Sequence, residues 1–271
     1  MPGEFIALDP RDLAGGQMYH LLNAVIAPRP IAWISSLGPN GVFNIAPHSY
    51  TTVFSPDPPI VGFVSVGRKD TVRNVEATRE FVYQIADESL AERLNRSAAD
   101  FPPDQSEFTW AGLTAVRGDI VGAPRAIEAP VAMEARLVEV IEIAKTGNLL
   151  VLGEVVRVHL ADRIMSGDRV DPALLRPLGR LAGSQFSRLG DLFSLDRPTY
   201  RGLVAEGTGP MGKGGDGLLT PRPPSSRPSG KGGVPGSDGR AVGGGVVAVE
   251  AVEFGVVVGL VDGDVDQKGD A

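Results

Sequence analysis

Short segments rich in β-branched and aromatic residues, each bounded by a turn signal, recur through the first 204 residues. Residues 31–37 form one such segment, and residues 42–54 form the next. Between them lies Pro39-Asn40-Gly41, and an Asn-Gly pair is a strong hairpin signal. Further strands are expected over residues 60–66, 80–86, 131–143 and 149–160. A chain of this kind favours an antiparallel sheet that closes into a barrel.

Helical segments are few. Residues 70–79 are predicted to form a helix with Asp70 as its N-cap, and residues 88–99 a second one. Residues 106–118 are rich in short polar side chains and are expected to form a loop. In the strand over residues 131–143 the alternation slips near Val138, which indicates a bulge. The predicted fold class is therefore mainly β with two or three helices.

The composition changes near Gly207. Residues 205–271 hold 18 of the 35 glycines and a single aromatic residue, Phe254, so this stretch cannot bury enough apolar surface to offset the entropy of ordering it. We expect one domain over residues 1–204 and a Gly/Pro-rich, low-complexity tail over residues 205–271 that is disordered or loosely attached. Residues 207–212 match G-x-G-x-x-G, but no helix can follow, so the match is taken as chance.

Charge and composition exclude several classes of function. The net charge of −7 disfavours a broad nucleic-acid surface. The absence of cysteine removes disulfides and thiolate chemistry, and the three scattered histidines predict no metal site. No stretch reaches the roughly 18 apolar residues of a membrane span, and the N-terminus lacks a signal pattern. The expected location is the cytoplasm.

The second strand of the hairpin changes character in the middle. Residues 44–49 read Asn-Ile-Ala-Pro-His-Ser, a small and polar run where a buried strand is expected to be apolar. Unpaired buried polar groups cost roughly 1–3 kcal/mol each, so such a cluster needs partners. A planar heterocycle with carbonyls and ring nitrogens supplies them; the alternative is that these side chains face water. The residues concerned are Ser35, Ser36, Asn44, His48, Ser49, Thr51 and Thr52.

A second candidate site follows the strand over residues 60–66. Arg68 and Lys69 precede the helix, and Thr71 lies in its first turn. Unpaired N–H groups and the positive end of the dipole favour an anion at a helix start, so these residues indicate a phosphate site. An ordinary capped helix in a solvated turn is the alternative.

Side chains for acid–base or nucleophilic catalysis are not apparent. His48 is a candidate ligand contact, and His159 is expected to be a surface or hydrogen-bonded structural residue. Glu139 and Glu142 are expected to face solvent, and G-x-S-x-G is absent. This pattern is compatible with hydride transfer between a nicotinamide and a flavin, where the cofactors carry the chemistry.

Four motifs resemble flavin reductase-like proteins with the FMN-binding split barrel. They are P-R-P-I-A-W at residues 28–33, N-x-A-P-x-S at 44–49, D-P-P at 57–59 and K-D-T-x-R-N at 69–74. Residues 148–160 and 176–190 continue the resemblance more weakly, with Ala182 where the family has a glycine and Phe186 where it has a tyrosine. It covers about residues 17–190 and implies an antiparallel, Greek-key-like split β-barrel that binds FMN as a homodimer.

The resemblance also implies roles for individual residues. Ser35 and Ser36 are placed near the flavin ribityl or phosphate. Contacts to the isoalloxazine edge are implied for Asn44, Ala46, His48, Ser49 and Thr51. The FMN phosphate is assigned to Ser65, Arg68, Lys69 and Thr71. Arg180 is placed near the flavin, where the second substrate approaches.

The function expected on this basis is an FMN-dependent oxidoreductase that takes a hydride from NAD(P)H, with a partner monooxygenase or another acceptor downstream. A non-catalytic flavin-binding, storage or electron-transfer module is the alternative. A split barrel that binds haem is a third reading, against which the phosphate site argues.

Overall fold

The computed structural model describes residues 5–205. The chain divides into two compact units between Asp191 and Leu192, and the described part of the second unit contains helix α6 (Tyr200–Ala205). The tail predicted for residues 206–271, with the G-x-G-x-x-G match at 207–212, lies outside the described residues. No helix in residues 5–205 is both long and apolar enough to cross a bilayer.

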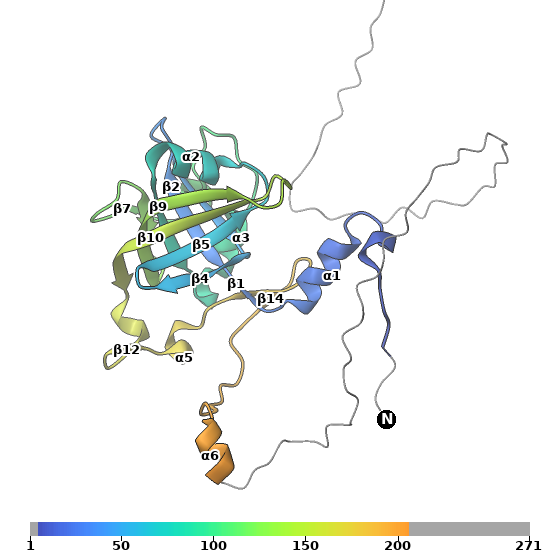
Figure 1. Cartoon of the computed structure of the whole chain (residues 1–271). Helices are drawn as coiled ribbons and strands as arrows, with labels where there is room; N and C mark the ends of the chain where they lie inside the picture. Colours follow the sequence, from blue (N-terminus) through green and yellow to red (C-terminus); the bar gives the residue numbers. More distant parts are fainter. Residues whose placement is uncertain (1–4, 206–271) are drawn as a thin grey trace, which may run out of the picture. The chain divides into compact units, whose positions relative to one another are not determined.

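One seven-stranded antiparallel sheet forms the body of the first unit, in the order β3-β2-β6-β9-β10-β5-β4. Its strands are β2 (Ala32–Leu37), β3 (Phe43–His48), β4 (Thr51–Pro56), β5 (Pro59–Ser65), β6 (Glu80–Ile85), β9 (Val131–Glu142) and β10 (Leu149–Leu160). The two edge strands, β3 and β4, are consecutive in the chain. The chain passes from one to the other through the turn at Ser49-Tyr50, and His48 Nδ1 of β3 lies 3.4 Å from Val64 O of β5, so the sheet curls into a barrel (Figure 1).

Shorter elements surround the barrel. The small strands are β1 (Arg29–Pro30), β7 (Ala115–Arg117), β8 (Pro124–Ala126), β11 (Met165–Ser166), β12 (Arg169–Val170), β13 (Gly179–Arg180) and β14 (Phe186–Ser187). The α-helices are α1 (Gln17–Val25), α2 (Asp70–Thr78), α3 (Ala91–Arg96), α4 (Glu107–Trp110) and α5 (Pro172–Leu175). Three 3₁₀ turns are η1 (Pro10–Asp12), η2 (Glu88–Leu90) and η3 (Asp162–Ile164).

Strand β2 separates two apolar cores because its side chains alternate between the faces of the sheet. Ile34 packs inside the barrel with Phe63, Phe81 and residues of α2. Trp33 faces the other way and packs with Leu94 of α3 and Phe108 of α4. Helix α2 therefore covers the inner core at the open end of the barrel, whereas α3 and α4 cover the outer face of β2 and β3.

Several boundaries differ from the sequence predictions. The strand expected over residues 42–54 breaks at Ser49-Tyr50, where the chain turns from β3 into β4. The helix expected over 88–99 is η2 followed by the shorter α3, and the expected loop at 106–118 contains α4 and β7. The N-cap of α2 is Lys69 and not Asp70. Helix α1 was not anticipated.

Candidate functional site

The polar run on β3 places Asn44, Ala46 and His48 on one face of the strand, because alternate residues share a face. This is the inner face, since the His48 ring lies 4.5 Å from the Phe63 ring, which belongs to the inner core. β3 is an edge strand of the seven-stranded sheet, so one of its two backbone edges has no neighbouring strand in that sheet. The predicted contact residues Asn44, Ala46 and His48 therefore point into the barrel, and Asn44 lies where β3 meets α2.

Asn44 is the centre of a buried hydrogen-bond network. Its Oδ1 accepts from Thr71 Oγ1 at 3.0 Å and from Ser36 Oγ at 3.3 Å. Asn74 Nδ2 donates to Ser36 Oγ at 3.2 Å, which ties α2 to β2. Three residues assigned to the site from sequence, Ser36, Asn44 and Thr71, are thus brought together and all three are buried.

Glu107 completes this network and was not identified from the sequence. It opens α4, is 6% exposed, and accepts from Asn44 Nδ2 at 2.8 Å and from the Ile45 backbone N–H at 3.2 Å. Burial raises the pKa of Glu107, and nearby Asp70 adds to this, while the hydrogen bonds oppose it. The only sequence signal was an acid three residues before a tryptophan in a polar stretch, which does not indicate burial.

The cationic turn before α2 has the features of an anion site. Lys69 is the N-cap residue, yet its side chain makes no capping hydrogen bond to the first turn. Arg68 pairs with Glu76, and Lys69 lies 3.5 Å from Asp100; both cations are about half exposed, at 53% and 51% of their side chains. Exposed ion pairs of this kind contribute little, so they yield readily to a ligand.

His48 carries a buried polar atom without a partner among the described residues. Its Nδ1 lies 3.4 Å from Val64 O, while Nε2 is buried and makes no hydrogen bond. Burial, together with the charge of Lys69, lowers the pKa of His48 to about 4, although the contact with Val64 opposes this. His48 is therefore neutral near pH 7. If Nδ1 carries the proton, Nε2 presents an unused acceptor.

Other predicted site residues lie in different surroundings. Ser35 faces away from Asn44, donating to Pro124 O and accepting from Gln84 Nε2 at 3.0 Å. Thr51 Oγ1 donates to Gly62 O at 2.7 Å and lies 2.8 Å from the Tyr83 hydroxyl.

The remaining predicted residues lie near the barrel ends. Ser65 Oγ donates to Gly67 O at 2.8 Å, which shapes the cationic turn. Ala46 and Ser49 are partly exposed on β3 and in the turn that follows it. Arg180, on β13, lies over the Phe186 ring at 4.5 Å and donates to Gln185 O at 3.4 Å.

A cavity of about 230 Å³ adjoins the network. Its walls come from the β2–β3 turn, the first turns of α2 and the segment before α4, and it is lined by Pro39, Asn40, Val42, Asn44, Asp70, Arg73, Asn74, Pro103, Gln105 and Glu107. Asn44 and Glu107 thus lie between the barrel and this cavity.

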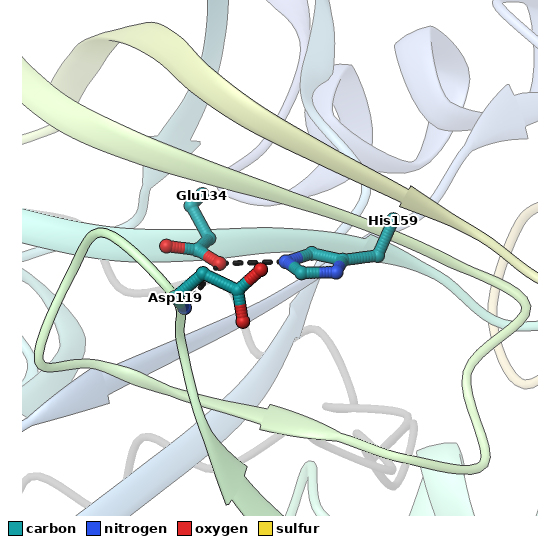
Figure 2. A group of neighbouring side chains, drawn as sticks. All are labelled: Asp119, Glu134 and His159. Carbon is teal, nitrogen blue, oxygen red and sulfur yellow. Dashed lines mark hydrogen bonds and ion pairs between the residues drawn. The ribbon is translucent and has the colours of Figure 1, made fainter.

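A separate group, Asp119, Glu134 and His159, has side chains of metal-ligating type within 4.8 Å of one another (Figure 2). Glu134 is fully buried and accepts from His159 Nε2 at 2.6 Å. It also accepts from the backbone N–H groups of Asp119 and Ile120, each at 2.7 Å, and Val121 at 2.9 Å. These bonds occupy the carboxylate, so the group anchors a loop, and the prediction that His159 is structural is confirmed.

The comparisons with known proteins agree with this geometry. The sequence model of the family described as "Flavin reductase like domain" matches residues 25–175. An uncharacterised protein from Halalkalibacterium halodurans is 38% identical over 202 residues, covering 71% of this chain and 96% of that protein.

The chain is also similar in fold to several solved structures. Nitrilotriacetate monooxygenase component B from Bacillus cereus has a TM-score of 0.68 and 33% identity, covering 71% of this chain and 100% of that chain. Pseudomonas fluorescens 2-nitrobenzoate 2-nitroreductase has a TM-score of 0.67 and 31% identity, covering 72% and 98%. A Shewanella frigidimarina protein described as a flavin reductase with a split barrel domain has a TM-score of 0.64 and 21% identity, covering 69% and 96%, and supports the fold alone.

Proposed function

The chain belongs to the flavin reductase-like domain family and has its split-barrel fold, and from this premise we propose that it is an FMN-dependent oxidoreductase that takes a hydride from NAD(P)H. The observation that carries the proposal is the buried, unpartnered Nε2 of His48 beside the cationic turn at the start of α2. At one end of the barrel, His48 Nε2 can accept a hydrogen bond from a ring N–H, and the cationic turn can bind a phosphate. FMN carries both groups.

The phosphate end of the cofactor is assigned to the cationic turn. Lys69 and Arg68 supply positive charge, and the N–H groups of the first turn of α2, including that of Thr71, lack a side-chain cap. The Ser65 hydroxyl, through its bond to Gly67 O, holds the turn in shape. These residues fit a phosphate group.

The ring end is assigned to β3. His48 Nε2 offers an acceptor to a ring donor, and its neutral state near pH 7 keeps that lone pair available. Ala46 and Ser49 leave room for close approach of the backbone, because their side chains are small. Asn44 and Thr51 hold the walls of the opening through their internal hydrogen bonds.

Bound FMN supplies the redox chemistry, accepting a hydride from the nicotinamide and passing electrons to an acceptor. The chain itself binds and orients the two partners, which raises the rate by proximity. A homodimer and a cytoplasmic location complete the proposal. The 33% identity to a monooxygenase component from Bacillus cereus supports a partner monooxygenase as the acceptor.

The test is an absorbance spectrum of the freshly purified full chain, recorded anaerobically before and after addition of NADH or NADPH. The proposal expects flavin bands that bleach with at least one nicotinamide. Flavin bands that persist with both would favour a storage or electron-transfer module, and a spectrum without flavin after reconstitution with FMN would contradict both.

A further inference from the structure

We propose that Glu107 is a positioning residue that sets, through Asn44, the direction in which the Thr71 hydroxyl points, and so tunes how the start of α2 receives a phosphate. This relay, from Glu107 through Asn44 to Thr71, follows from hydrogen-bond geometry in the described residues. Its consequence for the phosphate rests on the proposed function.

The first step concerns the orientation of the Asn44 amide. The Glu107 carboxylate accepts two N–H groups, from Asn44 and from the backbone of Ile45. A carboxylate has no hydrogen to donate, so the side of Asn44 that faces it must be the NH₂ group. Asn44 Oδ1 then points the opposite way, toward β2 and α2.

The second step concerns the hydroxyl hydrogens. Asn44 Oδ1 is only an acceptor, so Thr71 Oγ1 at 3.0 Å and Ser36 Oγ at 3.3 Å both donate to it. Ser36 also accepts from Asn74, which agrees with this direction. With Glu107 ionised, the hydrogen of Thr71 is turned inward and is withheld from a phosphate at the helix start.

The third step concerns a neutral side chain at position 107. A glutamine at this position has a single oxygen, which accepts from the Ile45 N–H, so its NH₂ group faces Asn44, and Asn44 accepts by turning its amide over. A protonated Glu107 can make the same bond to Asn44 through its O–H. The NH₂ group of Asn44 then faces Thr71 and Ser36, whose oxygens accept, and the Thr71 hydrogen becomes available to a phosphate oxygen.

The groups around Glu107 favour its protonated, uncharged form more than water does. The side chain lines the cavity of about 230 Å³, where Asp70 and Arg73 of α2 are the other charged groups. Burial and Asp70 raise the pKa of Glu107, so it takes up a proton at a higher pH than an exposed glutamate. The remaining lining residues are uncharged, and β3 contributes no charged residue to this wall.

The experiment compares the dissociation constants of FMN and riboflavin, which lacks the phosphate, for the wild type and Glu107→Gln at constant ionic strength. We expect the preference for FMN over riboflavin to rise about tenfold in Glu107→Gln, the effect of one charge-assisted hydrogen bond. The difference from the wild type should shrink as pH falls through the pKa of Glu107. Glu139→Gln, at an exposed position of β9, is the matched control.

A double-mutant cycle separates the relay from a general loss of structure. Thr71→Val keeps the shape and removes the hydroxyl, so the double variant Glu107→Gln/Thr71→Val should lose the gain in FMN preference. Equal weakening of FMN and riboflavin in Glu107→Gln, or a gain that survives Thr71→Val, would overturn the proposal.

The relay is also measurable without any flavin. In the flavin-free chain, the side-chain NH₂ signals of Asn44 should shift in Glu107→Gln and remain unchanged in Glu139→Gln by NMR. Unchanged Asn44 signals in both variants would overturn the relay even where FMN binds. A shift in a chain that binds no flavin would retain the relay and contradict the proposed function.

Discussion

At the residue scale, the candidate site depends on which buried polar atoms have a hydrogen-bond partner and which do not. Asn44 and Thr71 have internal hydrogen-bond partners, whereas His48 Nε2 is buried without one. A buried polar atom without a partner is costly, and its persistence points to a ligand that is absent from the free chain. The two kinds of residue therefore have different roles: Asn44 and Thr71 are oriented by their internal partners, and His48 Nε2 is an acceptor that only a ligand can use.

The lowered pKa of His48 makes a prediction about stability. Its pKa falls from an ordinary 6.5 to about 4, mainly because of burial, so the folded chain takes up this proton less readily than the unfolded chain. The stabilisation is therefore present above pH 6.5 and is lost as pH falls toward 4. Between about pH 7 and pH 5 we expect a loss of about 2 kcal/mol in the free energy of unfolding. Urea denaturation at both pH values measures this loss, and it should be smaller in His48→Gln.

His20→Gln is the control for that experiment, because His20 is exposed and lies on α1. It should retain the pH dependence of the wild type. A His48→Gln variant with the same pH dependence as the wild type would show that His48 titrates normally.

Lys69 provides the second prediction at this scale. Lys69→Ala removes a half-exposed cation from the phosphate turn and breaks only a surface pair with Asp100. We expect FMN to bind roughly tenfold more weakly, since a charge-assisted contact is lost, while riboflavin affinity and stability hardly change. Fluorescence titration measures both ligands. Equal loss for the two would place the phosphate elsewhere, and Arg169→Ala, on the exposed β11–β12 hairpin, is the control.

At the scale of elements, the sequence predicts strands better than it predicts their ends. The strand expected over residues 149–160 is confirmed as β10, and the bulge expected near Val138 is confirmed by the register, which passes from Glu139 to Leu137. A long segment in which apolar and polar residues alternate is recognisable as a strand from its sequence alone. The break at Ser49-Tyr50 has no such signal in the sequence, because it arises where the chain passes from one edge of the sheet to the other.

In the candidate site, too, the sequence indicates residues that are close along the chain but not those that only the fold brings together. Neighbouring residues such as Lys69 and Thr71 were found because the chain itself brings them together. Glu107 lies 62 and 63 positions from its partners on β3, so only the fold joins them. Ser35 was grouped with Ser36 by sequence, yet strand alternation turns it toward Gln84.

Gly153 provides a prediction about the packing between β10 and β6. A Cβ at this position would lie 2.3 Å from Phe81 Cζ, a fully buried ring in the inner core. Gly153→Ala should therefore reduce the free energy of unfolding by about 1–3 kcal/mol, because the core cannot make room without strain. Chemical denaturation measures the change. Gly15→Ala, where nothing lies within 4 Å, should be close to neutral, and similar values for both would contradict the account of the core.

At the scale of the whole molecule, the barrel explains why distant segments make one site. Edge strand β3, helix α2 and the short helix α4 converge at the open end of the barrel, and none of them forms the site alone. The proposed contacts all come from residues before 110.

Truncation after Ala205 should therefore leave FMN affinity and the melting temperature within error of those of the full chain. FMN titration and thermal denaturation of the truncated and full chains measure this. A truncated chain that no longer binds FMN would show that residues 206–271 belong to the binding unit.

The central claim is that FMN binds at the opening between β3 and the start of α2. The most direct measurement is a crystal structure of the chain grown with FMN. We expect a phosphate beside Lys69 and the first turn of α2, with a ring donor at His48 Nε2. An opening closed by the protein's own side chains, with FMN bound elsewhere or not at all, would contradict it.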